Sequence, residues 1–360
     1  MSVVWVHTPS VGEYVTAKPL LEYLKGRGHR LVVTYSSPRA EEFMKKQSLA
    51  DRYLHLPISG LLLGFSVKLF VRKYKPDVLL LVESDRYPSL LGAKVPTKLL
   101  INARLGRRSY KLLKALKGIY KPLLSRFDAI VCKDRETAER FGELGVPREK
   151  LAVCGNLKAV FKPNLKGSNI SFPSHKRVLV AGSTHKGEEE VILSAFGKIK
   201  RKLPDTILVL APRHPSRASE VYNLARKIHP NLETSLRSEA GETFKGDILV
   251  VDTLGELLHF YRLSTVSFVG GSLVPIGGHN LLEPAYFGKP VMFGTHIGKF
   301  KDLVQILESL GLAFPVRDEK EFTQTALRLL RNPPTPKGDL ISISNRILEC
   351  YKGVLDRWIG

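Results

Sequence analysis

The sequence has few cysteines and no long uncharged apolar run, and each absence excludes a class of protein. Its 360 residues include three cysteines, Cys132, Cys154 and Cys350, which are too few and too scattered for a disulfide framework or a CxxC zinc site. No stretch approaches the ~18 uncharged apolar residues of a membrane-spanning helix, and no charged-then-apolar leader precedes the first strand-like run. We therefore expect a cytoplasmic protein with reduced thiols and no structural metal.

Acidic residues are also scarce relative to basic ones. The chain has 34 Asp and Glu against 56 Lys and Arg, a net charge of +22, and residues 1–160 carry most of this excess with 29 basic and 14 acidic side chains. Such a field attracts a polyanion, whether nucleic acid, an anionic membrane surface or a phosphorylated ligand. Charge alone does not choose among them.

The order of the apolar runs predicts an α/β protein with two doubly wound, Rossmann-like halves. Strand-like runs alternate with helical stretches, and the pattern restarts after a polar segment, 162–176, that is typical of a linker. We expect a first domain at 1–161, a second at 177–340, and a final helix at 341–360 that could pack back on the first. The predicted strands are Val3–His7, Leu31–Tyr35, Val78–Glu83, Leu99–Ala103, Arg177–Ala181, Ile207–Ala211, Ile248–Asp252, Val266–Val269 and Pro290–Phe293, and the predicted helices include Val15–Arg27, Glu188–Lys202 and Arg217–Lys227. Ligands of such folds bind at the carboxyl ends of the strands, so we expect a cleft between the halves.

The loop after the first strand contains Ser10, Gly12 and Glu13, and a helix follows it. Ser10 and Glu13 have the spacing of a capping box, in which each side chain satisfies the other residue's backbone N–H. Alternatively, Glu13 is a general base that takes a proton from an acceptor hydroxyl, and the positive end of the helix favours its charged form. The sequence leaves both interpretations open.

A second pair of acids, Glu83 and Asp85, follows the strand-like run Val78–Val82. Residues two apart in an extended chain face the same side, so both could line one pocket. Two solvated loop acids are the ordinary alternative.

Two stretches of the first half combine basic residues with an apolar stripe. Residues 102–126 contain eight Lys and Arg and no acid, and apolar residues at helical spacing run from Leu112 to Phe127; residues 61–75 are apolar and end in basic residues. Both stretches are typical of membrane-surface helices. For 112–127 we expect the stripe to pack into the core, which would still leave two charged faces for an anionic lipid surface.

The second half offers three further loops. Ser183, Thr184 and His185 follow Gly182 at the end of a strand, where small residues let backbone N–H groups approach an anion, although an ordinary helix N-cap explains them as well. Pro212 and Arg213 open a proline-stiffened loop that presents a guanidinium suited to phosphate.

The third loop is the most informative. Glycines and polar residues follow a strand, and a short helix is expected to open at Asn280 with its N–H groups facing the cleft. Glu283 could accept hydrogen bonds from two ribose hydroxyls. The residues of interest are Gly271, Ser272, His279, Asn280 and Glu283.

With these loops assembled, the chain resembles the metal-independent glycosyltransferases of the GT-B fold, in which two Rossmann-like domains face each other across a cleft. More specifically, it resembles bacterial 3-deoxy-D-manno-oct-2-ulosonic acid (Kdo) transferases of lipopolysaccharide assembly. The motifs occur in order over nearly the whole chain: SVGE at 10–13, NARL at 102–105, GNLK at 155–158, GSTHKGEE at 182–189, PRHP at 212–215, DTLGEL at 252–257 and FVGGSLVPIGGHNLLEPA at 268–285.

The resemblance implies a role for each matching residue. Glu13 would be the general base, and Glu83 and Lys158 would stabilise the transition state. The residues that would hold the CMP part of the donor are Pro212, Arg213, Leu254, Gly255, Glu256, Asn280, Leu281, Leu282 and Glu283. The implied reaction transfers Kdo from CMP-Kdo to a hydroxyl of a lipid A precursor, lipid IVA, with inversion and without a metal or other cofactor. The implied location is the cytoplasmic face of the inner membrane.

Two departures from the family pattern and two rival functions remain. The family carries Glu and Trp where this chain has Asp85 and Tyr87, and members usually have a hydrophobic anchor before the first strand. We therefore expect either a longer natural chain or docking through the basic surface alone. The rivals are a GT-B enzyme that uses a UDP-sugar, either a lipid-linked glycosyltransferase or a nucleotide-sugar epimerase, and a basic nucleic-acid-binding protein. We expect no nucleic-acid partner, because stacking motifs and zinc fingers are missing from the sequence.

Overall fold

The computed structural model describes residues 1–56, 60–83, 88–160, 162–163, 168–298 and 300–359. The chain divides into two compact units: Met1–Val160 together with Ile343–Gly360, and Phe161–Ser342. The last residues of the chain therefore belong to the first unit.

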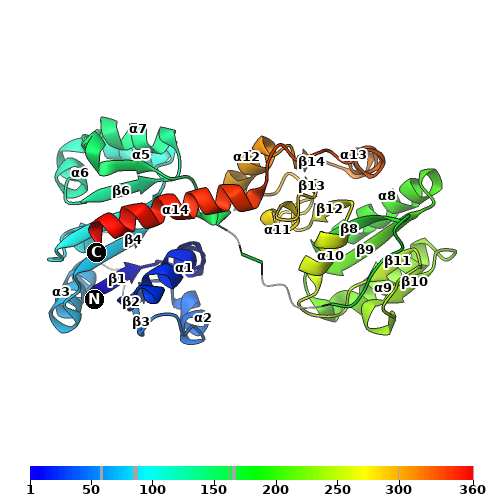
Figure 1. Cartoon of the computed structure of the whole chain (residues 1–360), viewed down its shortest axis with the longest axis horizontal. Helices are drawn as coiled ribbons and strands as arrows, with labels where there is room; N and C mark the ends of the chain where they lie inside the picture. Colours follow the sequence, from blue (N-terminus) through cyan, green and yellow to red (C-terminus); the bar gives the residue numbers. More distant parts are fainter. Residues whose placement is uncertain (57–59, 84–87, 161, 164–167, 299, 360) are drawn as a thin grey trace. The chain divides into compact units, whose positions relative to one another are not determined.

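The first unit is built on a parallel sheet whose strands lie in the order β3-β2-β1-β4-β5-β6-β7 (Figure 1). Its strands are β1 (Val3–His7), β2 (Arg30–Tyr35), β3 (Arg52–His55), β4 (Val78–Val82), β5 (Thr97–Ala103), β6 (Ala129–Cys132) and β7 (Leu151–Val153). Its helices are α1 (Val11–Gly26), α2 (Glu41–Lys45), α3 (Gly60–Tyr74), α4 (Pro88–Leu91), α5 (Arg107–Ala115), α6 (Lys117–Leu124), α7 (Arg135–Glu143) and most of α14 (Leu340–Trp358). Strands with helices on both faces have no polar side, which is why β1 and β4 are almost entirely apolar and buried.

The second unit repeats this plan in the strand order β10-β11-β9-β8-β12-β13-β14, again with parallel pairing. Its strands are β8 (Arg177–Thr184), β9 (Thr206–Pro212), β10 (Thr234–Leu236), β11 (Ile248–Val250), β12 (Val266–Val269), β13 (Val291–Phe293) and β14 (Ala313–Pro315). Its helices are α8 (Glu188–Lys202), α9 (Ala218–Ile228), α10 (Leu257–Leu263), α11 (Leu282–Ala285), α12 (Lys301–Ser309) and α13 (Glu319–Arg331). Two doubly wound sheets confirm the predicted α/β class.

The sheets differ from the sequence prediction mainly at their edges. The sequence analysis did not predict five strands of three or four residues: β3, β6, β7, β10 and β14. All of these except β6 are edge strands. The helix predicted at Val15–Arg27 begins at Val11, directly after its Ser10 cap. β8 continues to Thr184, so part of the predicted loop after it is strand.

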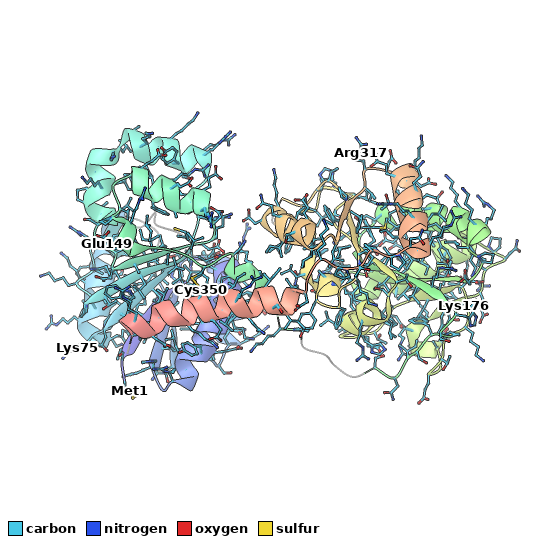
Figure 2. The ribbon with its side chains drawn as sticks, turned by 45° about the horizontal axis from the view of Figure 1, so that its top comes forward. Met1, Lys75, Glu149, Lys176, Arg317 and Cys350 are labelled. Carbon is cyan, nitrogen blue, oxygen red and sulfur yellow. A yellow bond between two sulfur atoms is a disulfide. The ribbon has the colours of Figure 1, made fainter. Side chains whose placement is uncertain are left out.

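The cysteines correct the expectation of reduced thiols. Cys154, after β7, forms a disulfide with Cys350 on α14, whose position Figure 2 shows. Near this bond, the Tyr351 hydroxyl donates to the carbonyl oxygen of Gly155 at 3.1 Å. The bond and the hydrogen bond attach the last helix to the loop of the GNLK motif. The expectation failed because the two cysteines are 196 residues apart in sequence.

The basic segment 102–126 also differs from its prediction. It forms two helices, α5 and α6, which are separated at Leu116. Leu112, Leu116 and Ile119 are exposed, whereas Phe127 is buried. The expected packing of this apolar stripe into the core is therefore wrong for its first three members. Nowhere in the described ranges does a helix combine the length and apolarity needed to cross a bilayer.

Candidate active site

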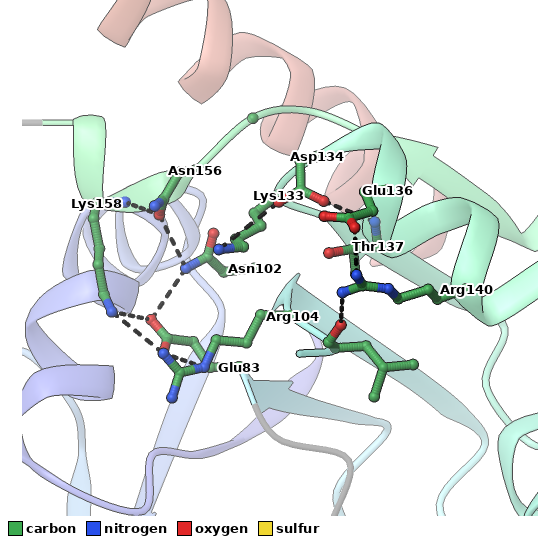
Figure 3. A network of polar contacts seen from close by, with 12 residues as sticks. Glu83, Asn102, Arg104, Lys133, Asp134, Glu136, Thr137, Arg140, Asn156 and Lys158 are labelled. Atoms are coloured by element: carbon green, nitrogen blue, oxygen red, sulfur yellow. Dashed lines mark hydrogen bonds and ion pairs between the residues drawn. The ribbon is translucent and has the colours of Figure 1, made fainter. Parts of the chain in front are cut away.

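Glu83 is the centre of a charged cluster in the first unit (Figure 3). It directly follows β4 and is buried, with a φ of 62° in the left-handed region. Its Oε1 lies 3.0 Å from Nζ of Lys158, and its Oε2 lies 3.8 Å from Nε of Arg104. A buried carboxylate is tolerated when it is paired and hydrogen-bonded, and these two cations compensate its charge.

Asn102 connects this cluster to the rest of the unit. Its Nδ2 donates to Oε1 of Glu83 at 3.1 Å, and its Oδ1 accepts from the backbone N–H of Leu157 at 2.9 Å. The Tyr351 hydroxyl of α14 also donates to Oδ1, at 3.4 Å. Asn102 has a φ of 51°. Left-handed backbone at a non-glycine residue costs of order 1–3 kcal/mol and concentrates at functional sites, so two such residues in contact support a functional cluster.

The GNLK motif supplies the other side of the cluster. Asn156 accepts the backbone N–H of Lys158 at 3.0 Å, which caps the short turn Leu157–Ala159 and directs Lys158 toward Glu83. Sequence reasoning selected Glu83 and Lys158 but did not name Asn102, Arg104 or Asn156 as site residues. The NARL and GNLK motifs contained the signal, because in each of them an Asn lies two residues before a basic residue.

Ser10 and Glu13 form the capping box in the structure. The backbone N–H of Ser10 donates to Oε2 of Glu13 at 3.1 Å, the Ser10 hydroxyl donates to the same atom, and the N–H of Gly12 donates to Oγ of Ser10 at 3.2 Å. Glu13 is half-buried at the carboxyl end of β1, the edge of the sheet where Glu83 also lies. The capping interpretation is confirmed. It fixes the carboxylate in place, and the general-base role stays a prediction.

Glu188 organises the glycine-rich loop of the second unit. Its fully buried carboxylate accepts the N–H groups of Gly271 at 2.7 Å, Ser272 at 3.0 Å and Leu273 at 2.9 Å, together with that of His185 at 2.9 Å. The sequence analysis predicted that backbone N–H groups of this kind could bind a ligand anion. In this structure an internal carboxylate takes them, so they hold the loop in shape.

The same loop brings two histidines together. Nε2 of His185 lies 2.8 Å from Nε2 of His279, and the ring planes are within 3° of parallel. One ring must donate and the other accept. Burial lowers the pKa of His185, against the effects of Glu188 and Glu189. A Cβ on Gly271 would lie 3.0 Å from the His279 ring, so a glycine suits this position.

Glu283 lies on α11, close enough to Arg213, which follows β9, for the charge of Arg213 to affect it. Burial raises the pKa of Glu283 to about 7, against a hydrogen bond from Asn280 and the positive charge of Arg213. Arg213 is exposed, and its backbone N–H donates to the carbonyl of Thr184 at 2.9 Å. A carboxyl with a pKa near neutrality and a nearby guanidinium form a polar site that could hold hydroxyls and an anion.

The remaining predicted residues of the second unit are mostly buried or hydrogen-bonded to nearby backbone. The short helix α11 begins at Leu282, two residues later than the predicted opening at Asn280, and Oδ1 of Asn280 accepts the N–H of Leu282 at 3.1 Å. Leu281, Leu282 and Pro212 are buried, and Ser183 has a φ of 56° at the end of β8.

Glu256 is already bonded within its own unit. Its Oε1 accepts from Ser168 at 2.5 Å and lies 3.0 Å from Nη2 of Arg237. Burial alone would raise the pKa of Glu256, but hydrogen bonds from Ser168 and Thr253 and the charge of Arg237 lower it overall. Beside it, Leu254 is 82% exposed and Gly255 has a φ of 90°. This loop is therefore held by Glu256 and exposes Leu254.

The structure thus brings together Glu83 with Lys158, His185 with His279, and Glu283 with Arg213. Asp85 lies outside the described residues. Within the described ranges, no group of three or more His, Cys, Asp or Glu side chains could hold a metal ion.

The fold defines a class. The UDP-GlcNAc 2-epimerase from Neisseria meningitidis, solved with UDP-GlcNAc bound, aligns over 100% of this chain and 99% of its own with a TM-score of 0.59 and 11% sequence identity. At that identity the likeness concerns the fold alone, which is the two-sheet GT-B architecture of glycosyltransferases and nucleotide-sugar epimerases.

Sequence comparison then identifies the family. Residues 1–161 match the family described as 3-deoxy-D-manno-octulosonic-acid transferase (kdotransferase). The 3-deoxy-D-manno-octulosonic acid transferase of Aquifex aeolicus is 39% identical over 330 residues, 91% of this chain and 85% of its own length. The enzyme of the same name from Haemophilus influenzae is 29% identical over 98% of this chain and 85% of its own. The chain belongs to the Kdo transferase family of glycosyltransferases, as its motifs predicted.

Proposed function

We propose that this enzyme transfers Kdo from CMP-Kdo to a hydroxyl of a lipid A precursor in lipopolysaccharide assembly, with inversion at the anomeric carbon and without a metal. Family membership supports the transferred sugar. The observation that carries the mechanism is the ion pair between the buried Glu83 and the half-buried Lys158, which lies at the carboxyl edge of the same sheet as Glu13.

Glu13 would act as the base in a single displacement. Its carboxylate takes the proton of the acceptor hydroxyl, the hydroxyl oxygen attacks the anomeric carbon of Kdo, and the bond from that carbon to the CMP phosphate oxygen breaks. CMP leaves with the electron pair. The Ser10 N–H and hydroxyl hold the Glu13 carboxylate in one orientation, which favours attack from one direction.

The charges of the cluster match those that develop during transfer. Positive charge grows at the anomeric carbon, where a fixed carboxylate such as Glu83 stabilises it, and negative charge grows on the leaving phosphate, where Lys158 is suited to act. Because hydrogen bonds and backbone conformation already hold both side chains, they need little reorganisation during the reaction.

The donor nucleotide would lie in the second unit. The Arg213 guanidinium would contact the CMP phosphate, and Glu283 would accept hydrogen bonds from ribose hydroxyls. Burial raises the pKa of Glu283 to about 7, against the effect of the nearby Arg213, so the carboxylate form that accepts hydrogen bonds from hydroxyls is populated at and above neutral pH.

The acceptor is a phosphorylated lipid, so the enzyme would work at an anionic surface, the cytoplasmic face of the inner membrane. Basic residues dominate the first 160 positions. The exposed Leu112 and Ile119 lie on α5 and α6, which contain basic residues and no acid, and the exposed Leu116 lies between these two helices. Exposed apolar side chains among cations are typical of peripheral membrane binding.

The test is direct transfer. The enzyme is incubated with CMP-Kdo and a tetra-acylated, bis-phosphorylated lipid A precursor in EDTA, and the mass of the acceptor and the release of CMP are measured. We expect a mass gain of one or more Kdo residues and an equal amount of CMP. A parallel reaction with UDP-N-acetylglucosamine should yield neither transfer nor epimerisation. Absence of product from CMP-Kdo alongside turnover of the UDP-sugar would overturn the proposal.

A further inference from the structure

The first unit contains a groove that none of the catalytic residues uses. It has a volume of about 520 Å³ and lies between α3 and the residues that follow α4. From α3 it is lined by Gly64, Val67, Lys68, Val71 and Arg72. Spacings of three and four residues place all five on one face of the helix, so the groove is a continuous surface along about two turns.

The groove combines an apolar interior with a basic rim. Gly64 has no side chain to fill the space beside Val67 and Val71, and Ala93 forms part of the opposite wall. Lys68, Arg72 and the exposed Lys94 also line it. Among the described residues none of these three cations pairs with a carboxylate, and no acid lines the groove.

The surroundings of the groove are equally suited to lipid. Phe65 and Leu69, on the adjoining face of α3, are 64% and 51% exposed. A helix that exposes aromatic and aliphatic side chains beside unpaired cations fits the boundary between lipid head groups and acyl chains. The groove belongs to the same unit as the charged cluster, and the residues of its opposite wall, Gly92 to Lys94, lie between α4 and β5.

We infer that this groove binds one acyl chain of the phosphorylated lipid acceptor, while Lys68, Arg72 and Lys94 contact its phosphate. The inference rests on the proposed function and deepens it, because it assigns a site to the lipid part of the acceptor. A volume of this size is within the range of small-molecule sites, ~300–1,000 Å³. The apolar interior excludes a free phosphate or a sugar as the sole occupant, and the charged rim favours an anionic amphiphile over a neutral one.

Binding is tested first without any reaction. The full-length enzyme is titrated calorimetrically with dodecyl phosphate below its micelle-forming concentration, with dodecyl maltoside and inorganic phosphate as comparisons. We expect saturable 1:1 binding of dodecyl phosphate, at least tenfold weaker binding of dodecyl maltoside, and no measurable binding of phosphate. Gly64→Leu, which fills the groove, should weaken dodecyl phosphate binding at least tenfold, whereas Gly64→Ala should weaken it less than threefold.

The rim is tested separately, since the leucine could perturb the helix. Lys68→Gln combined with Arg72→Gln should weaken dodecyl phosphate binding at least tenfold. The matched control, Lys73→Gln, removes the same kind of charge from α3 outside the groove lining and should have less than a twofold effect. Equal losses from rim and control variants would mean general attraction to positive charge and would overturn the assignment. Unchanged binding in both Gly64→Leu and the rim variant would do the same.

Turnover then ties the groove to the acceptor. With the tetra-acylated precursor, Gly64→Leu should raise KM at least tenfold, and with the deacylated, water-soluble disaccharide bisphosphate it should change kcat/KM less than twofold. Equal losses on both acceptors would overturn the acyl-chain site while leaving the transferase proposal intact. Failure of the wild-type enzyme to transfer Kdo to either acceptor would instead overturn the proposed function, and the dodecyl phosphate titration would still decide whether the groove binds an acyl chain.

Discussion

Glu13 has two roles in our account, and substitution can separate them. Glu13→Gln removes the basic carboxylate but retains an oxygen that can accept the Ser10 N–H, because Gln also serves in capping boxes. We therefore expect the free energy of unfolding to change by less than ~1 kcal/mol. Without the base, kcat should fall about 100-fold or more, which corresponds to about 2.7 kcal/mol in the activation barrier.

Ser10→Ala is the matched control. It removes the hydroxyl that accepts the Gly12 N–H and contacts Glu13, but it keeps the carboxylate. Loss of such a cap costs about 1 kcal/mol of stability. We expect a small decrease in Tm and a kcat within about fivefold of wild type. The two substitutions should therefore have opposite profiles, one catalytic and one structural.

The assay measures CMP release at saturating donor and acceptor, with thermal unfolding and CMP binding measured on the same samples. CMP affinity should be unchanged in both variants, because Glu13 belongs to the first unit and the proposed nucleotide residues to the second. A Glu13→Gln enzyme with wild-type kcat would refute the general-base role. Equal loss of kcat in both variants would show that the cap, rather than a proton acceptor, is what the reaction needs.

Three further predictions concern charges and covalent bonds. A thiol titration of the denatured, unreduced protein should find one free thiol, and three would contradict the Cys154–Cys350 bond. Reduction of this bond should lower Tm, because closing a loop of this length contributes up to ~5 kcal/mol in the chain-entropy account. Glu188→Gln should destabilise the second unit by about 3 kcal/mol in a denaturant titration, because it weakens four N–H···carboxylate bonds. The control is Glu190→Gln, at an exposed carboxylate that caps α8 through the N–H of Gly187, and it should cost less than ~1 kcal/mol. Glu283 has a folded-state pKa of about 7, above its ordinary value of 4.5, so the folded state binds more protons, and the stability that this group contributes falls as pH rises from about 4.5 to 7. Glu283→Gln should therefore gain stability relative to wild type over that window, and the same difference in stability between the two proteins at pH 5 and pH 8 would contradict this.

The central strands could be predicted from sequence because parallel strands covered on both faces are apolar throughout. Val3–His7 and Val266–Val269 have the predicted bounds. The edge strands could not be predicted in this way. β7 and β10 have three residues each and are only partly buried, so their sequences carry no long apolar run. Pairing with a neighbour, rather than local composition, makes them strands.

Contacts between residues that are far apart in sequence could not be predicted either. Lys158 and Glu83 were each selected, but their ion pair spans 75 residues and no spacing rule predicts it. Glu188 was not selected as a site residue because it is one of three acids in the first turn of α8, where the helix dipole favours any negative charge. Its four N–H partners become visible only when β8 and β12 lie side by side.

The bonds already made by each carboxylate help to assign its role. Glu188 is fully buried and accepts four backbone N–H groups, and Glu256 is bonded to a serine, a threonine and an arginine, so neither has much capacity left for a ligand. Glu83 has two cations and an amide, which suits a fixed charge that stabilises rather than one that exchanges protons. The capping contacts of Glu13 engage Oε2, which leaves Oε1 to accept a proton, and Glu283 sits near the protonation midpoint at neutral pH. Proton transfer and hydroxyl binding both need acceptor capacity in the resting enzyme, and by that criterion we propose Glu13 and Glu283, rather than Glu188 and Glu256, as the carboxylates that contact substrates.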